Sequence, residues 1–281
     1  MGISRKLFSK ILFHAFLLAF AFIMFYPVLW LISSSLKSMQ EIVANPSSIL
    51  PSRITFDNWI NGWKGFGGVT FGTFMLNSLF ISSASTVFQV IFSALVAYGF
   101  ARNRFRGKNV LFTMMILTML LPSQVLLVPQ FIMFNSLGLR NSYLPLLLPT
   151  MFGLPFFIFM IMQFIKGIPA ELDEAAHIDG CNKYTIFLRI ILPLLVPALI
   201  TSAIFAFYWK WQEFFEPLLY LQKTNKFTVS IAVKMFADPN AGTDWGAIYA
   251  ISVATIIPVL LIFVCFQKYL VEGIATTGLK S

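Results

Sequence analysis

The segment 171–197, ELDEAAHIDGCNKYTIFLRIILPLLVP, is a polar, acid-containing stretch between two long apolar runs. Its start contains three carboxylates, Glu171, Asp173 and Glu174. Carboxylates in a first turn interact favourably with the helix dipole, and Pro169 suits the start of a helix because its missing N–H is not needed there. Gly180 tolerates the left-handed conformation that commonly ends a helix. The segment therefore predicts a short helix, outside the bilayer core, that ends at a glycine turn.

The residues after Gly180 predict a second short helix. Within residues 182–192, apolar side chains recur at the i, i+3, i+4, i+7 spacing of one helical face: Tyr184, Phe187, Leu188 and Ile191. Pro193 and Pro197 end this pattern, because proline disrupts a helix interior. We expect the order helix, glycine turn, helix, proline.

The composition indicates an integral membrane protein. Hydrophobic residues make up 58% of the 281 residues and charged residues only 11%, whereas soluble domains contain about 25% charged residues. A net charge of +9 would elsewhere suggest a nucleic-acid partner, but here Lys and Arg gather in short loops between apolar runs. That distribution is typical of the cytoplasmic loops of membrane proteins, so no nucleic-acid binding is expected.

Six apolar runs are long enough to cross a bilayer core, which takes about 20 residues each. They are residues 11–32, 74–98, 110–134, 143–165, 194–221 and 247–270. We expect an all-α, polytopic membrane protein with six transmembrane helices. If the N-terminus is cytoplasmic, the inner loops hold more Lys and Arg than the outer loops, which predicts that both termini and the segment 171–197 are cytoplasmic.

The same segment carries a recognisable motif. Glu174-Ala175-Ala176, Gly180 and Ile190-x-Leu192-Pro193 resemble the EAA loop of the membrane subunits of bacterial ABC importers, in which EAA is followed by three residues, G, nine residues and I-x-L-P. The resemblance implies the type I ABC importer permease fold, with this loop as the coupling helix that docks onto an ATP-hydrolysing subunit. It assigns that contact to Glu171, Asp173, Glu174, Ala175, Ala176, Asp179 and Gly180.

Two predicted outer loops resemble one particular branch of this family. Residues 35–51, SLKSMQEIVANPSSILP, and residues 137–142, LGLRNS, resemble the carbohydrate-uptake branch of this family, in the subunit type called MalG-like. The resemblance implies a permease subunit of an ATP-driven importer in the bacterial plasma membrane, which moves a sugar, an oligosaccharide or multiple sugars by alternating access. The implied partners are a second permease subunit, two ATP-binding subunits, an extracytoplasmic solute-binding protein and membrane lipid. The alternatives are an importer for another solute and a stand-alone secondary transporter, which would need internal repeats that are not clear in this sequence.

ATP hydrolysis is not expected from this chain itself. The sequence contains no G-x-x-x-x-G-K-[ST] phosphate-binding loop and no His/Cys cluster with metal-ligand spacing. We therefore expect a transport subunit rather than an enzyme, with no cofactor or metal of its own and with ATP and magnesium on the partner subunits.

Three parts are expected along the chain. Residues 1–73 form a first span and an outer loop, with a short interfacial helix near 56–63, where tryptophans favour the headgroup level. Residues 74–270 form the importer transmembrane domain, which includes the coupling loop 166–197. Residues 271–281 form a cytoplasmic C-terminal tail.

The fifth run contains polar groups at membrane depth, where charges usually face a water-filled path. Lys210 and Glu213 are three residues apart and can pair on one helix face. One hypothesis places Trp209, Trp211, Gln212 and Glu213 beside the translocation path, where aromatic faces would stack on sugar rings. The alternative is an aromatic belt whose charges extend to the interface.

The turn between the second and third runs is strongly basic. Residues 102–108 read RNRFRGK and would contact either anionic lipid or the ATPase subunit. The alternative, which the sequence alone favours, is that these cations only fix the topology.

Overall fold

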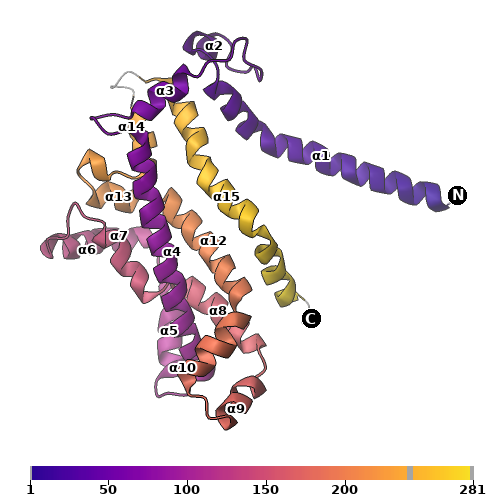
Figure 1. Cartoon of the computed structure of the whole chain (residues 1–281), viewed down its shortest axis with the longest axis vertical. Coiled ribbons are helices and arrows are strands. Elements are labelled where there is room, and N and C mark those ends of the chain that lie inside the picture. Colours follow the sequence, from indigo (N-terminus) through magenta and orange to yellow (C-terminus); the bar gives the residue numbers. More distant parts are fainter. Residues whose placement is uncertain (1, 239–242, 279–281) are drawn as a thin grey trace. The chain divides into compact units, whose positions relative to one another are not determined.

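The computed structural model describes residues 2–238 and 243–278, with side chains for residues 7–238 and 243–270. Within the described residues all regular secondary structure is helical (Figure 1), which confirms the all-α prediction. The side chains of the predicted tail, 271–281, lie outside the described part of the chain.

The helices range from membrane-length elements to short helices of one or two turns. The α-helices are α1 (Gly2–Ser35), α2 (Met39–Ala44), α3 (Asp57–Lys64), α4 (Phe71–Arg102), α5 (Lys108–Thr118), α6 (Ser123–Ser136), α7 (Leu144–Leu147), α8 (Pro155–Gly167), α9 (Glu171–Ile178), α10 (Lys183–Ile186), α11 (Leu192–Leu194), α12 (Val196–Gln212), α13 (Phe215–Tyr220), α14 (Val229–Phe236) and α15 (Trp245–Gly278). The 3-10 helices are η1 (Leu148–Phe152) and η3 (Thr224–Lys226), and the π-helix is η2 (Phe187–Ile191).

The chain forms two compact units. The first comprises Met1–Gly72 and Ala232–Ile257, and the second comprises Thr73–Ile231 and Pro258–Ser281. The second unit contains both the segment around Gly180 and the polar residues 209–216.

In the first unit, α3 approaches the beginning of α15 closely. A Cβ atom at Gly62 would lie 2.7 Å from Cγ2 of Ile251, so glycine permits this approach. The Asn58 side chain donates hydrogen bonds to the carbonyl oxygens of Ser35 (3.0 Å) and Lys37 (2.7 Å), which ties α3 to the end of α1. The presence of α3 confirms the short helix predicted near residues 56–63.

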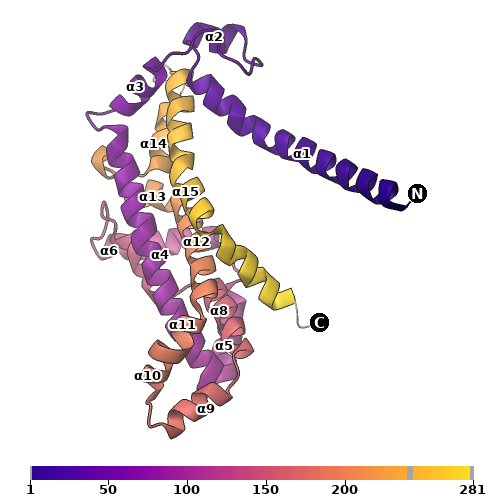
Figure 2. The ribbon, with the colours of Figure 1, turned by 45° about the vertical axis from the view of Figure 1, so that its right-hand side comes forward.

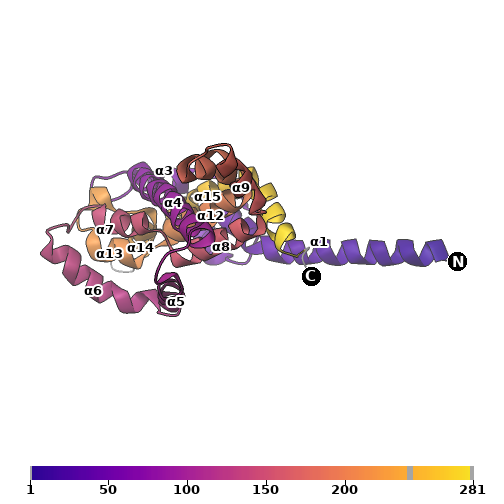
Figure 3. The ribbon, with the colours of Figure 1, turned by 90° about the horizontal axis from the view of Figure 1, so that it is seen from below.

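The number of apolar spans agrees with the sequence only if two bent pairs are counted as one span each. Within the described ranges 2–238 and 243–278, four helical segments are long and apolar enough to cross a membrane, or up to six if each bent pair is one span. The predicted span 110–134 is not one straight helix, because α5 and α6 meet at a 100° bend (Figure 3). Pro122 stands at the start of α6 in an extended conformation, which is the conformation that ends a helix.

The predicted span 194–221 is also broken. Its helix α12 begins at Val196, and α12 forms a 75° bend with the preceding helical segment Lys183–Leu194. At the other end, α12 stops at Gln212 because Glu213 is extended, with ψ at 128°. The polar residues at 213–216 therefore do not continue the helical face that the sequence predicted.

The fourth span is interrupted by Gly153, whose φ is +74°. A break in a membrane helix frees backbone groups that need other partners. The Ser93 hydroxyl on α4 accepts a hydrogen bond from the Leu154 N–H at 3.1 Å. A Cβ atom on Gly153 would lie 3.1 Å from the Ser93 Oγ, so α4 passes close to this break.

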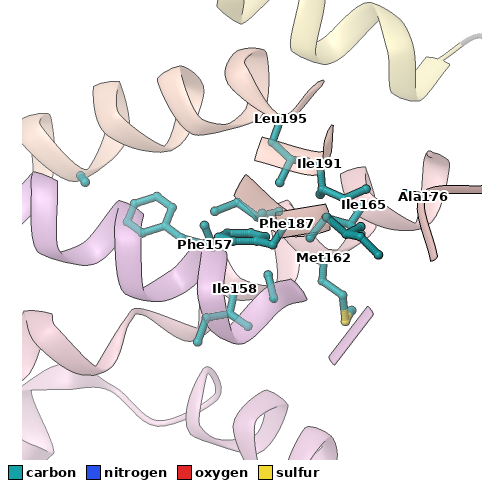
Figure 4. Close-up of a cluster of buried hydrophobic side chains, with 13 residues drawn as sticks. Phe157, Ile158, Met162, Ile165, Ala176, Phe187, Ile191 and Leu195 are labelled. Atoms are coloured by element: carbon teal, nitrogen blue, oxygen red, sulfur yellow. The ribbon is translucent and has the colours of Figure 1, made fainter. Parts of the chain in front are cut away.

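A buried apolar cluster in the second unit holds α8 against its neighbours (Figure 4). Phe157, Ile161 and Ile165 on α8 are fully buried. Ile191 and Leu195, which follow the segment around Gly180, are buried in the same cluster. Burial of apolar surface contributes about 25 cal/mol per Å² to folding. This cluster therefore stabilises the position at which the polar loop leaves the span.

Asn141 organises the turn between α6 and α7. It is the only non-glycine residue with a positive φ, +54°, among the described residues. Its side-chain oxygen accepts hydrogen bonds from the backbone N–H groups of Gln222 (3.2 Å) and Lys223 (3.1 Å), and its own N–H donates to the Tyr220 carbonyl at 2.8 Å. Asn141 therefore joins this turn to the end of α13.

Asn141→Ala is expected to destabilise the protein by about 1–3 kcal/mol, because two backbone donors lose their acceptor and alanine disfavours a positive φ. Asn141→Asp keeps the acceptor and should remain close to wild type. The melting temperature of the detergent-purified protein measures the difference. Equal melting temperatures for the alanine and aspartate variants would contradict this role of the side-chain oxygen.

Candidate functional site

The segment around Gly180 folds as the sequence predicts. α9 spans Glu171–Ile178 and has Glu171, Asp173 and Glu174 in its first turn. Gly180 follows with φ at +81°, the left-handed conformation expected after a helix end. Asn182 then caps α10, since its side-chain oxygen accepts a hydrogen bond from the Thr185 N–H at 2.9 Å. The helices α9, α10 and α11 lie at the same end of α4 (Figure 2).

The predicted apolar face of the second helix is split. Phe187 and Ile191 are buried, but Tyr184 is 81% exposed and Leu188 is 58% exposed. Phe187 and Ile191, four residues apart, pack in the cluster around α8, whereas Tyr184 and Leu188, also four residues apart, lie on an exposed side.

The outer surface of this segment combines apolar and acidic side chains. The exposed apolar residues are Leu172, Ala175, Ile178, Tyr184 and Leu188, and the exposed acidic residues are Glu171, Glu174 and Asp179. Ile178 is 87% exposed. We call this set the α9 face. Exposed large apolar side chains beside acidic residues favour a contact site for another protein.

Two residues of the predicted contact set point inward instead. Ala176 is buried in the cluster around α8. The carboxylate of Asp173 pairs with the Arg102 guanidinium at the end of α4, with Nε and Oδ2 2.8 Å apart. Both side chains are largely buried, at 15% and 18% exposure. Asp173 therefore anchors α9 within the chain, while Glu174 and Ala175 remain on the surface.

The end of α4 contacts the segment at further points that sequence reasoning missed. A second Arg102 nitrogen donates to the Ile168 carbonyl at 2.8 Å, just before α9. The Tyr98 hydroxyl donates to the Lys183 carbonyl at 3.4 Å, and the Tyr98 ring lies 4.9 Å from that of Phe187. The available signal was the basic turn that begins at Arg102, next to a carboxylate-rich helix with which it could pair. One end of α4 thus holds both α9 and α10.

The polar residues after α12 pair differently from the prediction. Lys210 does not pair with Glu213, as the helical spacing suggested, but with Glu216, with Nζ and Oε2 2.6 Å apart. Because the helix stops at Gln212, the Glu213 carboxylate instead accepts hydrogen bonds from the N–H groups of Phe215 (3.1 Å) and Glu216 (3.4 Å). Glu213 therefore caps the start of α13.

The four residues predicted beside a translocation path do not share one surface. Trp209 is 37% exposed and stacks on the buried Phe157 with ring centroids 5.3 Å apart. Gln212 is exposed, but Trp211 is buried and stacks on Phe207. Trp209 and Gln212 thus remain available on the surface of this chain, whereas Trp211 contributes to its interior.

The described residues offer no evident metal centre, since no group of three or more His, Cys, Asp or Glu side chains is placed to hold an ion in the ranges 7–238 and 243–270. The site consists of contact surfaces and anchoring pairs.

Apolar helices of membrane length, with an exposed acidic and apolar helix between spans, indicate a membrane protein that has a contact surface for a partner. The chain belongs to the family described as "binding-protein-dependent transport system inner membrane component", whose model matches residues 89–276. A permease of this family is a transport subunit, and the ATPase is a separate subunit.

Relatives and solved structures match over nearly the whole chain. The arabinooligosaccharides transport system permease AraQ of Halalkalibacterium halodurans is 34% identical and covers 97% of this chain and 98% of its own. The probable ABC transporter permease YurM of Bacillus subtilis is 34% identical over 94% of this chain and 87% of its own. A chain in the crystal structure of a bacterial importer of the acidic polysaccharide alginate is 25% identical, covers 95% of this chain and 97% of its own, and superposes with a TM-score of 0.80. The importer-permease fold predicted from the sequence is confirmed.

Proposed function

We propose that this chain is a permease subunit of an ATP-driven importer for a sugar, most simply an oligosaccharide, that an extracytoplasmic binding protein delivers. The observation that carries the proposal is the nearly full-length match to a relative named for arabinooligosaccharide transport. Other relatives are named for diacetylchitobiose in Streptomyces coelicolor and trehalose in Mycobacterium tuberculosis. Because these named solutes are all carbohydrates, they favour a sugar over other solutes.

The α9 face is proposed to dock onto the ATP-binding subunit. Its exposed acidic and apolar side chains lie on a loop that is anchored from behind by Asp173 and Ala176. Gly180 supplies the sharp turn after the docking helix. In the assembled importer this chain would join a second permease subunit and two ATP-binding subunits, which would hold ATP and magnesium.

The proposed cycle uses alternating access. Closure of the ATP-binding subunits would move α9, and the contacts of Arg102 and Tyr98 would pass that movement to α4. A ligand can shift such an equilibrium only by its different affinity for the two states, which here is supplied by ATP on the partner subunits. The charge distribution supports a location in the bacterial plasma membrane with α9 and both termini in the cytoplasm.

The decisive experiment is expression of the chain with its genomic neighbours, purification in mild detergent and identification of the proteins that co-purify. An ATP-binding subunit and a second permease should be found, and liposomes containing the complex should take up a labelled oligosaccharide only with ATP and the binding protein. Uptake of a non-sugar solute alone would refute the sugar assignment. Transport by the isolated chain without ATP would instead favour a secondary transporter.

Trp209 is the residue of this chain most suited to border the solute path. It is partly exposed and belongs to a group of aromatic rings, with Phe156 and Phe205 at centroid distances of 5.3 and 6.0 Å. Aromatic contacts contribute about 0.5–1.5 kcal/mol each beyond area burial.

Trp209→Ala is therefore expected to lower oligosaccharide uptake by about two- to tenfold at subsaturating solute, while Trp209→Phe should retain most of it because a ring remains. Uptake by reconstituted complexes at matched protein content measures both variants. Wild-type uptake by the alanine variant would remove Trp209 from the path.

A further inference from the structure

The end of α4 that holds α9 and α10 also forms a basic recess. The recess has a volume of about 420 Å³. Its cations come from the end of α4, the following turn, the start of α5 and the start of α10: Arg102, Arg104, Lys108 and Lys183. Two carboxylates, Asp173 and Glu174, and the His177 imidazole also line it.

The positive charge of this recess is only partly neutralised within the chain. Arg102 is paired with Asp173, but among the described residues Arg104, Lys108 and Lys183 make no ion pair. Cations so close together repel one another unless an anion lies between them.

Two of these cations are held toward the same residue. The Lys108 ammonium donates to the Asn103 carbonyl and the Lys183 ammonium donates to the Asn103 side-chain oxygen, each at 3.1 Å. These contacts hold ammonium groups from two separate elements beside one residue, Asn103. An anion in the recess would therefore meet ammonium groups from both elements.

An apolar surface begins next to the recess. α5 starts at Lys108 and exposes large apolar side chains along its length: Val110 (58%), Leu111 (51%), Met114 (57%) and Leu117 (54%). A soluble anion needs only the basic recess. A molecule with an anionic head and long apolar chains would use both the recess and the surface of α5.

We propose that the recess binds the phosphate of an anionic membrane phospholipid, with the acyl chains along α5. Lys and Arg near a membrane surface attract anionic lipids, and the recess lies where the membrane-length helix α4 ends. A bound headgroup would contact Arg104, Lys108 and Lys183 beside Glu174, so it would join the turn after α4 to the docking segment. This site is independent of which solute the importer carries.

The test places the full chain in nanodiscs of phosphatidylcholine that contain roughly 30% phosphatidylglycerol with the same acyl chains. It compares the wild type with variants of the recess. Native mass spectrometry counts the lipids that remain bound. The variant Arg104→Gln/Lys108→Gln removes two lining cations, and Arg106→Gln is the matched control, because Arg106 is exposed in the same turn but does not line the recess.

Wild type and Arg106→Gln should retain phosphatidylglycerol in preference to phosphatidylcholine. The double variant should lose this preference by roughly 25-fold, or about fivefold per removed cation. Lys183→Gln provides a second variant on a different element, so that a misfolded double variant cannot decide the result. The proposal would be overturned if the folded double variant and Lys183→Gln both kept the preference for phosphatidylglycerol. It would also be overturned if Arg106→Gln lost as much of that preference as the double variant. Displacement of the bound lipid by millimolar inorganic phosphate would assign the recess to a soluble anion instead.

Discussion

Arg102→Asp should reduce ATP-dependent solute uptake at least tenfold. The substitution leaves the largely buried Asp173 carboxylate beside a second negative charge and removes the donor to the Ile168 carbonyl. A hydrogen bond to a charged group contributes about 1.5–3 kcal/mol, and its loss here falls on the two contacts that set the start of α9. The proposed docking helix would then no longer be held in a fixed position at the end of α4.

The reversed pair is the control for this prediction. Arg102→Asp combined with Asp173→Arg restores an ion pair between the same two positions, so uptake should recover substantially beyond either single variant. The ratio of solute moved to ATP hydrolysed separates coupling from folding, because a merely destabilised complex would lower both quantities together. If the two single variants and the reversed pair all transport normally, the ion pair does not position α9.

Glu174→Lys is expected to reduce uptake to near background while leaving the amount of folded chain unchanged. The Glu174 side chain is exposed and makes no ion pair among the described residues, so the fold loses no internal partner. The reversed charge opposes the helix dipole by about 0.3–1 kcal/mol and adds a cation to the basic end of α4, where exposure to solvent screens the repulsion. The large effect therefore has to come from the interface with the ATP-binding subunit, where a like or misplaced charge costs several kcal/mol.

Glu174→Gln distinguishes charge from shape at this position. It keeps the size of the side chain and should give intermediate uptake. Co-purification of the ATP-binding subunit with each variant shows whether docking itself is lost. A Glu174→Lys complex that assembles and transports at the wild-type rate would place the docking contact elsewhere on the α9 face.

Local signals in the sequence were sufficient to predict the docking helix α9. Carboxylates in a first turn and a glycine at the end predicted α9 to within its observed bounds, because both effects depend on neighbouring residues only. The apolar runs likewise predicted the membrane-length helices, since bilayer thickness sets their length.

Contacts between distant residues could not be predicted in this way. The pairing of Arg102 with Asp173 depends on where α8 turns back against α4, and the buried cluster fixes that turn. Lys210 pairs with Glu216 because the helix ends at Gln212, and helix ends are poorly marked by hydropathy. The exposure of Leu188 depends on which side of its helix packs against α8, and the spacing of apolar residues alone does not reveal that side.

The bend between α5 and α6 affects whether the chain crosses the membrane an even or an odd number of times. The two helices have 11 and 14 residues, or about 16 and 21 Å, so neither alone reaches across a hydrocarbon core of about 30 Å. If the bent pair completes a crossing, the total stays even and the two ends of the chain face the same compartment. If it entered and left on one side, α8 would carry the chain to the face opposite the end of α4, but Asp173 on α9 pairs with Arg102 at that end. The contact between α9 and the end of α4 therefore requires the even count, so the bent pair around Pro122 has to complete a crossing.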